Sequence, residues 1–234
     1  MQGMNKINKG LSEINNKLKD GLIFCRKAYR ILEYAQRSEE GIKAVRLQKG
    51  KINKFIKEVL PISRYVQMKY CPGRQINVMW IDGNQSYDAY LLSSGYLVEA
   101  GEVPREQFIE VTTAVHQNDY LCRQYFVEKG HSCGPNGTKM DKKTKEIISK
   151  PYIYAYREHA DDFAAIIIER IGEKSKINYP ENTILLIWCQ LNHIFSESEW
   201  DYMVDKVKKA QVPNNFREKS LFDSNHRFFT TLYL

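Results

Sequence analysis

The chain has 234 residues, 43% of them hydrophobic and 12% aromatic, which is enough for one large domain or for one domain with an appendage. No apolar run approaches the ~18–20 residues that span a bilayer, and the polar start lacks the apolar centre of a secretory signal. Five scattered cysteines, an odd number, favour reduced thiols over a disulfide framework, so a cytoplasmic protein is expected.

The net charge of +7 is unevenly distributed along the chain. Residues 1–70 contain 16 lysines and arginines against 6 aspartates and glutamates, whereas residues 71–234 contain 19 against 22. The chain is therefore divided into a basic N-terminal segment, 1–70, and a slightly acidic body, 71–234. Such a segment is either an ordinary solvated helix surface or a contact for a polyanion, of which nucleic acid is the commonest.

The basic N-terminal segment is expected to be helical. Its first apolar residues are spaced four, three and four apart, as in one stripe along a helix: Ile7, Leu11, Ile14 and Leu18. This stripe predicts packing on the following helices or on a second copy of the chain, because exposed leucine and isoleucine side chains are costly. A second helical stripe covers residues 22–45, and a third helix covers 52–70, with Pro61 kinking or ending it.

After a turn at 71–75, the pattern changes to β-branched and aromatic runs separated by turn residues. In chain order, the body is expected to contain strands at 76–82, 87–94 and 107–114, a helix at 118–130, a long loop at 131–151, a helix at 154–176, a buried strand at 182–190, a helix at 196–210, and edge strands at 218–223 and 227–234. This order predicts an α/β fold with a mixed central sheet of four to six strands flanked by helices, and with a helical N-terminal extension.

Two carboxylates lie inside strand-like runs, Asp88 in SYDAYLLSS and Glu110 in FIEVTTA. Alternation along the predicted strand 107–114 places Ile109 and Val111 towards the core, and Glu110 and Thr112 on the other face. Neighbouring strands are about 4.8 Å apart, so two such carboxylates can share a cation such as Mg²⁺, which takes hard oxygen ligands. The alternative is that each carboxylate faces solvent or pairs with a lysine or an arginine.

This pattern resembles the PD-(D/E)XK nuclease superfamily, the restriction-endonuclease-like fold. In that family an aspartate opens a strand of a hairpin and an acid-x-lysine follows on the next strand, before a helix and a further strand. Asp88 matches the first acid and Glu110 the second, so the resemblance implies Mg²⁺-dependent phosphodiester cleavage with both as metal ligands. The third catalytic position departs from the family, because Thr112 stands in place of the lysine. Arg123 and Lys129, on the next predicted helix, are candidates to replace it.

A second likeness covers residues 110–131 only. Glu110–Ala114, Leu121–Arg123 and Gly130–His131 resemble bacterial proteins of unassigned function that carry E-V-T-x-A before an arginine-bearing helix ending in G-H. This likeness implies no activity.

In the same region Cys122 is expected to be a buried thiol on the apolar side of a helix, because its C-x8-H-x-C spacing to His131 and Cys133 matches no compact zinc pattern.

Two functions from different classes follow from these residues. The first is a nucleic-acid-binding or metal-dependent nucleic-acid-cleaving protein with a degenerate nuclease-like site and Mg²⁺ as its cofactor. Its phosphate contacts are expected from Arg123, Lys139, Lys142, Lys143 and Lys145. The alternative is a non-catalytic protein-interaction module, which uses its N-terminal helices to bind a helical partner or to form a homo-oligomer.

Overall fold

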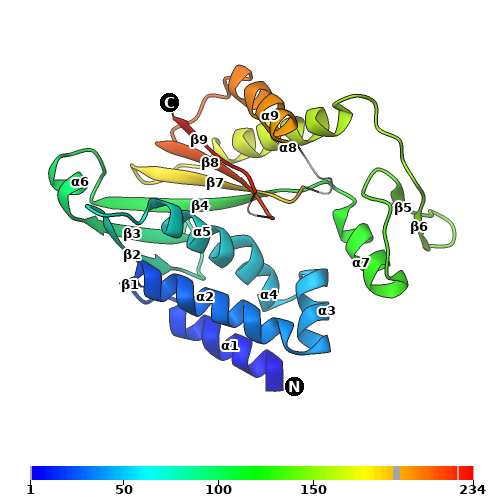
Figure 1. The fold of residues 1–234 in the computed structure, drawn as a ribbon, viewed down its shortest axis with the longest axis horizontal. Coiled ribbons are helices and arrows are strands. Elements are labelled where there is room, and N and C mark those ends of the chain that lie inside the picture. The colour runs from blue at the N-terminus through cyan, green and yellow to red at the C-terminus, as the bar shows by residue number, and fades with distance from the viewer. Residues whose placement is uncertain (1, 192–195, 226, 234) are drawn as a thin grey trace.

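The structure is a computed structural model that describes residues 2–191, 196–225 and 227–233. Its centre is a mixed sheet of seven described strands in the order β1-β2-β3-β4-β7-β8-β9, and helices cover both faces (Figure 1). The predicted α/β class and the helical N-terminal extension are confirmed. The sheet is one strand wider than the predicted range, since the two-residue strand β1 extends one edge.

The strands of the central sheet are β1 (Lys19–Asp20), β2 (Gln75–Trp80), β3 (Ala89–Ser94), β4 (Glu106–Ala114), β7 (Thr183–Cys189), β8 (Glu218–Asp223) and β9 (Phe229–Tyr233). Strands β5 (Thr138–Met140) and β6 (Ile147–Ser149) form a separate hairpin. The helices are α1 (Gln2–Ile14), α2 (Gly21–Gln36), α3 (Glu39–Leu47), α4 (Lys51–Lys54), the π-helical turn η1 (Phe55–Val59), α5 (Leu60–Lys69), α6 (Tyr96–Glu99), α7 (Asp119–Lys129), α8 (Glu158–Lys174) and α9 (Glu197–Lys209).

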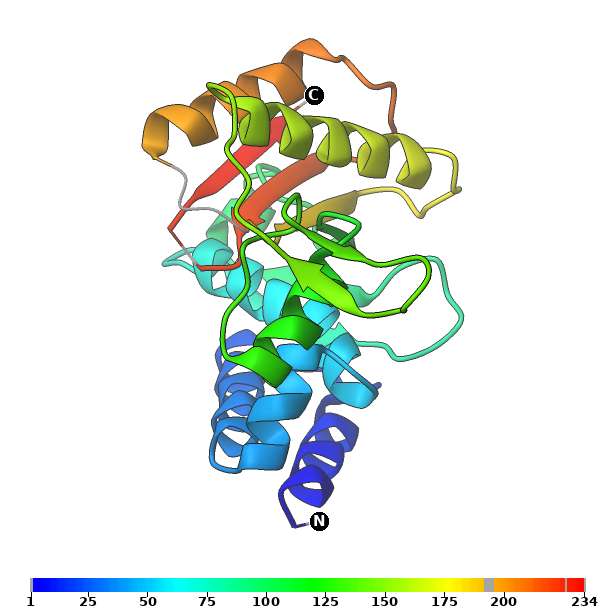
Figure 2. The same cartoon turned by 90° about the vertical axis from the view of Figure 1, so that its right-hand side faces the viewer.

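Two hydrophobic clusters hold the layers together. One joins α1, α2 and α5 to one face of the sheet and contains Ile109 and Val111, as the alternation predicted. The other joins α8 and α9 to the opposite face and contains Ala114. Figure 2, turned by 90°, shows the same layers with α8 and α9 above the sheet and the N-terminal helices below it. The first cluster runs without interruption from the basic segment into the body, across the predicted boundary at residues 70–71.

The N-terminal stripe packs within its own chain. Ile7, Leu11 and Ile14 are buried against the following helices. Gly10 allows the close approach of α1 to α2, because a Cβ atom there would lie only 2.6 Å from Cγ1 of Ile31. The prediction was wrong for Leu18, which lies beyond the end of α1 and is 47% exposed.

Pro61 shapes the third helix without ending it. The helical path continues from α4 through η1 into α5, and the Leu60 amide bonds to the Phe55 carbonyl, five residues back. Proline has no amide hydrogen to donate, and its ring crowds the carbonyl four residues earlier. The π turn just before Pro61 shifts the hydrogen-bond register of the helix, so the helix can continue past the proline. Glu58 lies in this π turn.

Two other predictions differ from the structure. The segment 131–151 contains the β5–β6 hairpin, whose turn is stabilised by Asp141 accepting from the amides of Lys143 and Thr144. Three-residue strands are too short to show a period in the sequence. The stripe at 22–45 forms two helices, because Ser38 caps a new one by accepting from the Gly41 amide.

The buried strand predicted at 182–190 is confirmed as β7, which is buried throughout and lies between two parallel neighbours, β4 and β8. The predicted edge strand at 218–223 is an inner strand, because β9 pairs along its other side. Leu234, the end of the last predicted strand, lies outside the described residues. Within the described ranges, no helix combines the length and apolarity that crossing a membrane requires.

Candidate functional site

Asp88, the residue just before β3, lies close to Glu110 in the middle of β4. The antiparallel register of β3 and β4 ends at the pair Ala89 and Ile109, and Asp88 is the next residue outside β3. The Asp88 amide donates to the Ile109 carbonyl at 2.7 Å, and Asp88 Oδ2 accepts from the Val111 amide at 2.8 Å. The charge of Asp88 raises the pKa of Glu110, so the two carboxylates are close enough to form one cluster.

The face of β4 that carries Glu110 is covered by α8 rather than by solvent. Glu110 and Thr112 are only 6% and 7% exposed. The Lys174 ammonium, on the last residue of α8, forms an ion pair with Glu110 Oε1. A cation therefore stands beside the carboxylate pair, but it comes from α8 and not from the motif position at Thr112.

Sequence reasoning missed Lys174. The ion pair joins residues 64 positions apart, and α8 enters the body after the β5–β6 hairpin. The amphipathic pattern of 154–176 indicates which side of the helix is buried, but it does not indicate where its last turn lies over the sheet. The only available signal was a lysine at the end of a predicted helix, which the helix dipole favours in any protein.

Glu58 is a third carboxylate of this cluster and was also missed. Its Oε2 accepts from the Trp80 indole nitrogen at 3.1 Å. Burial, followed by the charge of Asp88, raises the pKa of Glu58 to about 7. The signal that could have found it is Pro61, since the irregular turn that precedes this proline carries Glu58 towards the sheet.

The cluster holds more negative charge than its own cations balance. Burial, and then the charge of Asp88, raise the pKa of Glu110 to about 7 despite the Lys174 contact. Burial also raises the pKa of Asp88, although the Val111 hydrogen bond opposes this. A raised pKa means that the folded protein holds the proton more tightly than the unfolded chain does, which stabilises the fold. This stabilisation is complete at a pH below the unfolded-state pKa, and it is lost as the pH rises through the folded-state pKa, about 7 for Glu110. The metal-free protein at alkaline pH therefore carries destabilising carboxylate repulsion.

Tyr179, in the loop between α8 and β7, adds a polar atom to the cluster. Its hydroxyl is buried and makes no hydrogen bond of ordinary geometry. Burial, the neighbouring charges of Glu110 and Asp88, and a hydrogen bond to Glu110 that is weaker than ordinary geometry allows raise its pKa. The Tyr179 hydroxyl is therefore a neighbour of Glu110.

The donor set fits Mg²⁺ or Mn²⁺ better than zinc. Asp88 and Glu110 offer hard oxygens, and Mg²⁺ is commonly bound through one or two carboxylates while its other positions hold water and substrate phosphate. Across the part of the chain that the structure describes, no three His, Cys, Asp or Glu side chains are close enough to enclose a metal ion. Asp88 and Glu110 are therefore the two carboxylates considered as oxygen donors, without a complete ligand set among the described residues.

The other predicted residues lie outside this cluster. Arg123 is held by Asp119 and by Gln190 Oε1, the latter at 2.7 Å, and makes no ion pair with Asp88 or Glu110. Lys129 ends α7 and is exposed. Among the described residues, neither forms an ion pair with Asp88 or Glu110. Cys122 is buried, as expected for a structural thiol.

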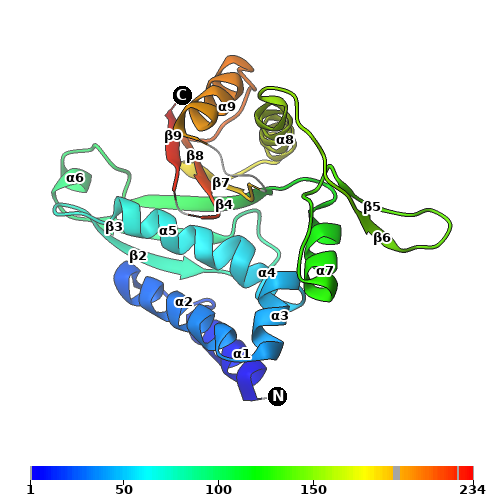
Figure 3. The same ribbon diagram turned by 45° about the vertical axis from the view of Figure 1, so that its right-hand side comes forward.

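The predicted phosphate-binding lysines lie on a projecting hairpin. Lys139, Lys142, Lys143 and Lys145 are all exposed on β5 and on the turn that follows it. Figures 1 and 3 show the β5–β6 hairpin beyond α7, extending away from the sheet. These lysines are therefore separate from the carboxylates and form a basic arm at the side of the body.

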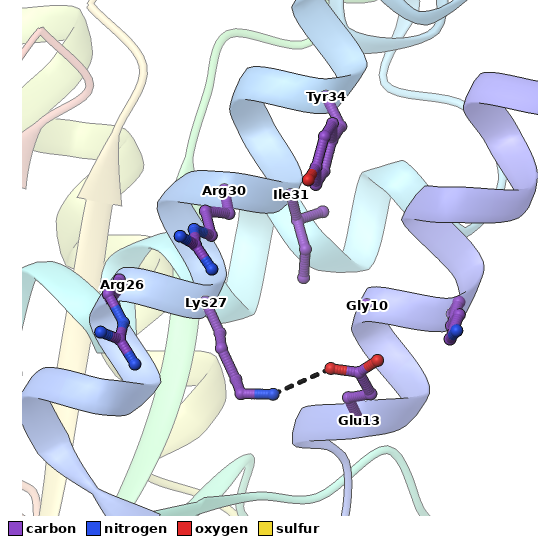
Figure 4. A pocket seen from close by; sticks show the side chains of 8 residues that line it. Gly10, Glu13, Arg26, Lys27, Arg30, Ile31 and Tyr34 are labelled. Atoms are coloured by element: carbon purple, nitrogen blue, oxygen red, sulfur yellow. Dashed lines mark hydrogen bonds and ion pairs between the residues drawn. The ribbon is translucent and has the colours of Figure 1, made fainter.

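A second basic surface, the α1–α2 groove, lies between the first two helices. It is a cavity of about 320 Å³ lined by Lys9, Gly10, Glu13, Arg26, Lys27, Arg30, Ile31 and Tyr34 (Figure 4). Glu13 is the only acid in this lining, and it is paired with Lys27 at 2.8 Å. Arg26 and Arg30 are exposed one helical turn apart and make no ion pair with a described residue. The groove is therefore open to an anionic ligand.

Comparisons with family models, with curated proteins and with solved structures find no match to this chain. The class of the protein is therefore the one that its fold and site define, an α/β protein with a carboxylate–lysine cluster between β4 and α8.

Proposed function

We propose that this protein is a metal-dependent phosphodiesterase that acts on nucleic acid and has a rearranged PD-(D/E)XK-type site. The observation that carries the proposal is the position of Lys174 beside the neighbouring carboxylates of Asp88 and Glu110. Further support comes from the chain order, in which Asp88 directly precedes β3 of the β2–β3 hairpin, Glu110 follows on β4, and helices precede β7. The lysine that the family has at the Thr112 position would here be supplied by α8.

The roles follow from the chemistry of each group. When bound by Asp88 and Glu110, Mg²⁺ would polarise the scissile phosphodiester and acidify a water molecule. The Lys174 ammonium is placed to stabilise negative charge that develops on the phosphate oxygens. Glu58 lies at the rim of the cluster, and its pKa of about 7 suits it to accept a proton near neutral pH.

Nucleic acid is the proposed substrate because two exposed basic surfaces accompany the cluster. The hairpin lysines and the α1–α2 groove both offer charge for phosphates. The interaction-module alternative loses its main support, since Ile7, Leu11 and Ile14 are already buried within the chain. We also propose a cytoplasmic location, which the five free thiols support.

Metal-dependent stabilisation tests the carboxylate pair directly. Millimolar Mn²⁺ is expected to raise the melting temperature of the wild type by a few degrees, and Glu110→Gln should remove this effect along with any cleavage. Without metal, Glu110→Gln should melt at the same or a higher temperature, because one of two repelling carboxylates is gone. Glu106→Gln is the matched control, since Glu106 is exposed on the same strand. A wild type that Mn²⁺ does not stabilise would contradict the metal site.

Salt dependence tests the basic arm. The affinity for DNA or RNA should fall steeply as salt rises, and Lys142→Gln with Lys143→Gln should reduce the slope of log K against log salt by roughly 1.5. Lys208→Gln with Lys209→Gln is the charge-matched control, because these exposed lysines lie on α9. Equal slopes for both double variants would show that the hairpin does not contact phosphates.

A further inference from the structure

An arginine is buried near the end of β3 that is distant from Asp88. Arg74 is 6% exposed and follows a tight turn in which its amide donates to the Cys71 carbonyl at 2.9 Å. Gly73 has φ +87°, as the third position of a Pro-Gly type II turn requires. The turn fixes the point at which Arg74 enters the sheet, and its side chain crosses towards β3 and β4.

All partners of the Arg74 guanidinium are neutral. Nε and Nη2 each lie 3.4 Å from Ser93 Oγ, and Nη2 donates to Gln107 Oε1 at 2.7 Å. No described carboxylate forms an ion pair with it, and Nη1 donates to no described residue. Arginine is almost never this buried without a paired anion, because an uncompensated buried charge is strongly destabilising.

The guanidinium lines a cavity of about 340 Å³. The lining residues are Lys69, Arg74, Glu102, Val103, Pro104, Gln107, Arg217 and Glu218. Glu218 is already engaged, with Lys69 at 3.1 Å and the Ser220 hydroxyl at 2.6 Å. Arg217 is exposed and makes no ion pair with a described residue, so Arg74 and Arg217 are the cations left for a ligand.

We infer that this cavity binds a small oxyanion, a phosphate or carboxylate group, which pairs with Arg74 and is covered from the surface by Arg217. The planar guanidinium matches two oxygens on one phosphorus or carbon atom. The volume leaves room for a small organic group attached to the anion. Neither Asp88 nor Glu110 lines this cavity, so the site is independent of the phosphodiesterase proposal.

Thermal melting in the presence of EDTA tests the oxyanion site without using metal or cleavage. At constant ionic strength, replacing chloride with inorganic phosphate should raise the melting temperature of the wild type by about 2 °C or more. Arg74→Met should abolish this rise, and its phosphate-free melting temperature should match or exceed that of the wild type, because an apolar chain replaces an unpaired charge. Arg105→Met, an exposed arginine outside the lining, should keep the rise. Equal rises in wild type and Arg74→Met would overturn the inference.

If Arg74→Met does not fold, nuclear magnetic resonance of the wild type tests the same inference. In the wild type, the Arg74 Nε–Hε signal should shift saturably with inorganic phosphate, and an unmoved signal would overturn the inference. Titration with succinate and with a nucleoside monophosphate then identifies the group, since the tighter ligand shows whether carboxylate or phosphate is preferred. A rival is that Glu102 pairs with Arg74 in solution. In that case Glu102→Gln would lower the melting temperature and phosphate would have no effect on the wild type, which would also overturn the inference.

Discussion

Replacing Lys174 with methionine is expected to lower the rate of metal-dependent cleavage by about 10²–10³-fold, because the variant loses the cation that faces the developing phosphate charge. Mn²⁺-dependent stabilisation should persist, since Asp88 and Glu110 keep their oxygens. Methionine retains most of the volume and apolar stem of lysine, so the end of α8 should stay in place. Single-turnover cleavage and metal-dependent melting, measured on the same preparation, separate catalysis from metal binding.

The double variant Lys174→Met with Thr112→Lys tests whether a lysine on β4 can take the place of the one on α8. Thr112 lies on the same face of β4 as Glu110 and is 7% exposed, so a lysine there would meet the carboxylate from the strand instead of from the helix. Cleavage should be recovered in part, because the charge returns to the position that the PD-(D/E)XK pattern gives it. Lys176→Met, an exposed position just beyond α8, is the control and should cleave normally. Normal cleavage by Lys174→Met would remove Lys174 from the mechanism.

Replacing Ile14 with aspartate is expected to destabilise the protein by more than about 4 kcal/mol, because it buries an unpaired carboxylate in a core position. Ile14 has no exposed surface and packs in the cluster that joins α1 and α2 to the sheet. A loss of this size is a large part of a typical total stability of about 5–15 kcal/mol, so much of the chain should unfold at physiological temperature.

Leu18 provides the matched comparison. It belongs to the same four-three-four stripe, but it is 47% exposed and lies outside α1. Leu18→Asp should change the free energy of unfolding by only about 0.5 kcal/mol. Urea unfolding of both variants gives the two values. If Ile14→Asp is as harmless as Leu18→Asp, α1 is a loose arm rather than a part of the core.

The pairing of Asp88 with Glu110 could be predicted because it depends on local rules. Asp88 directly precedes β3 and Glu110 lies on β4, and strands that follow one another along the chain usually pair. The period of two then places Ile109 and Val111 in one core and Glu110 on the opposite face, as observed. The same rules assigned Thr112 a place beside Glu110, but they could not show that α8 covers this face.

The sequence by itself determined the α/β class, the buried strand β7, the burial of Ile7, Leu11 and Ile14, and the neighbouring carboxylates, since all of these follow from periodicity and turn residues. Only the tertiary structure decided that Lys174 and Glu58 join the carboxylates, that Arg123 and the hairpin lysines do not, and that Arg74 is buried without an anion. The physical reason is that a period identifies the side of an element that must be covered. It does not identify the element that covers it, because that depends on where each crossover returns and where each helix ends.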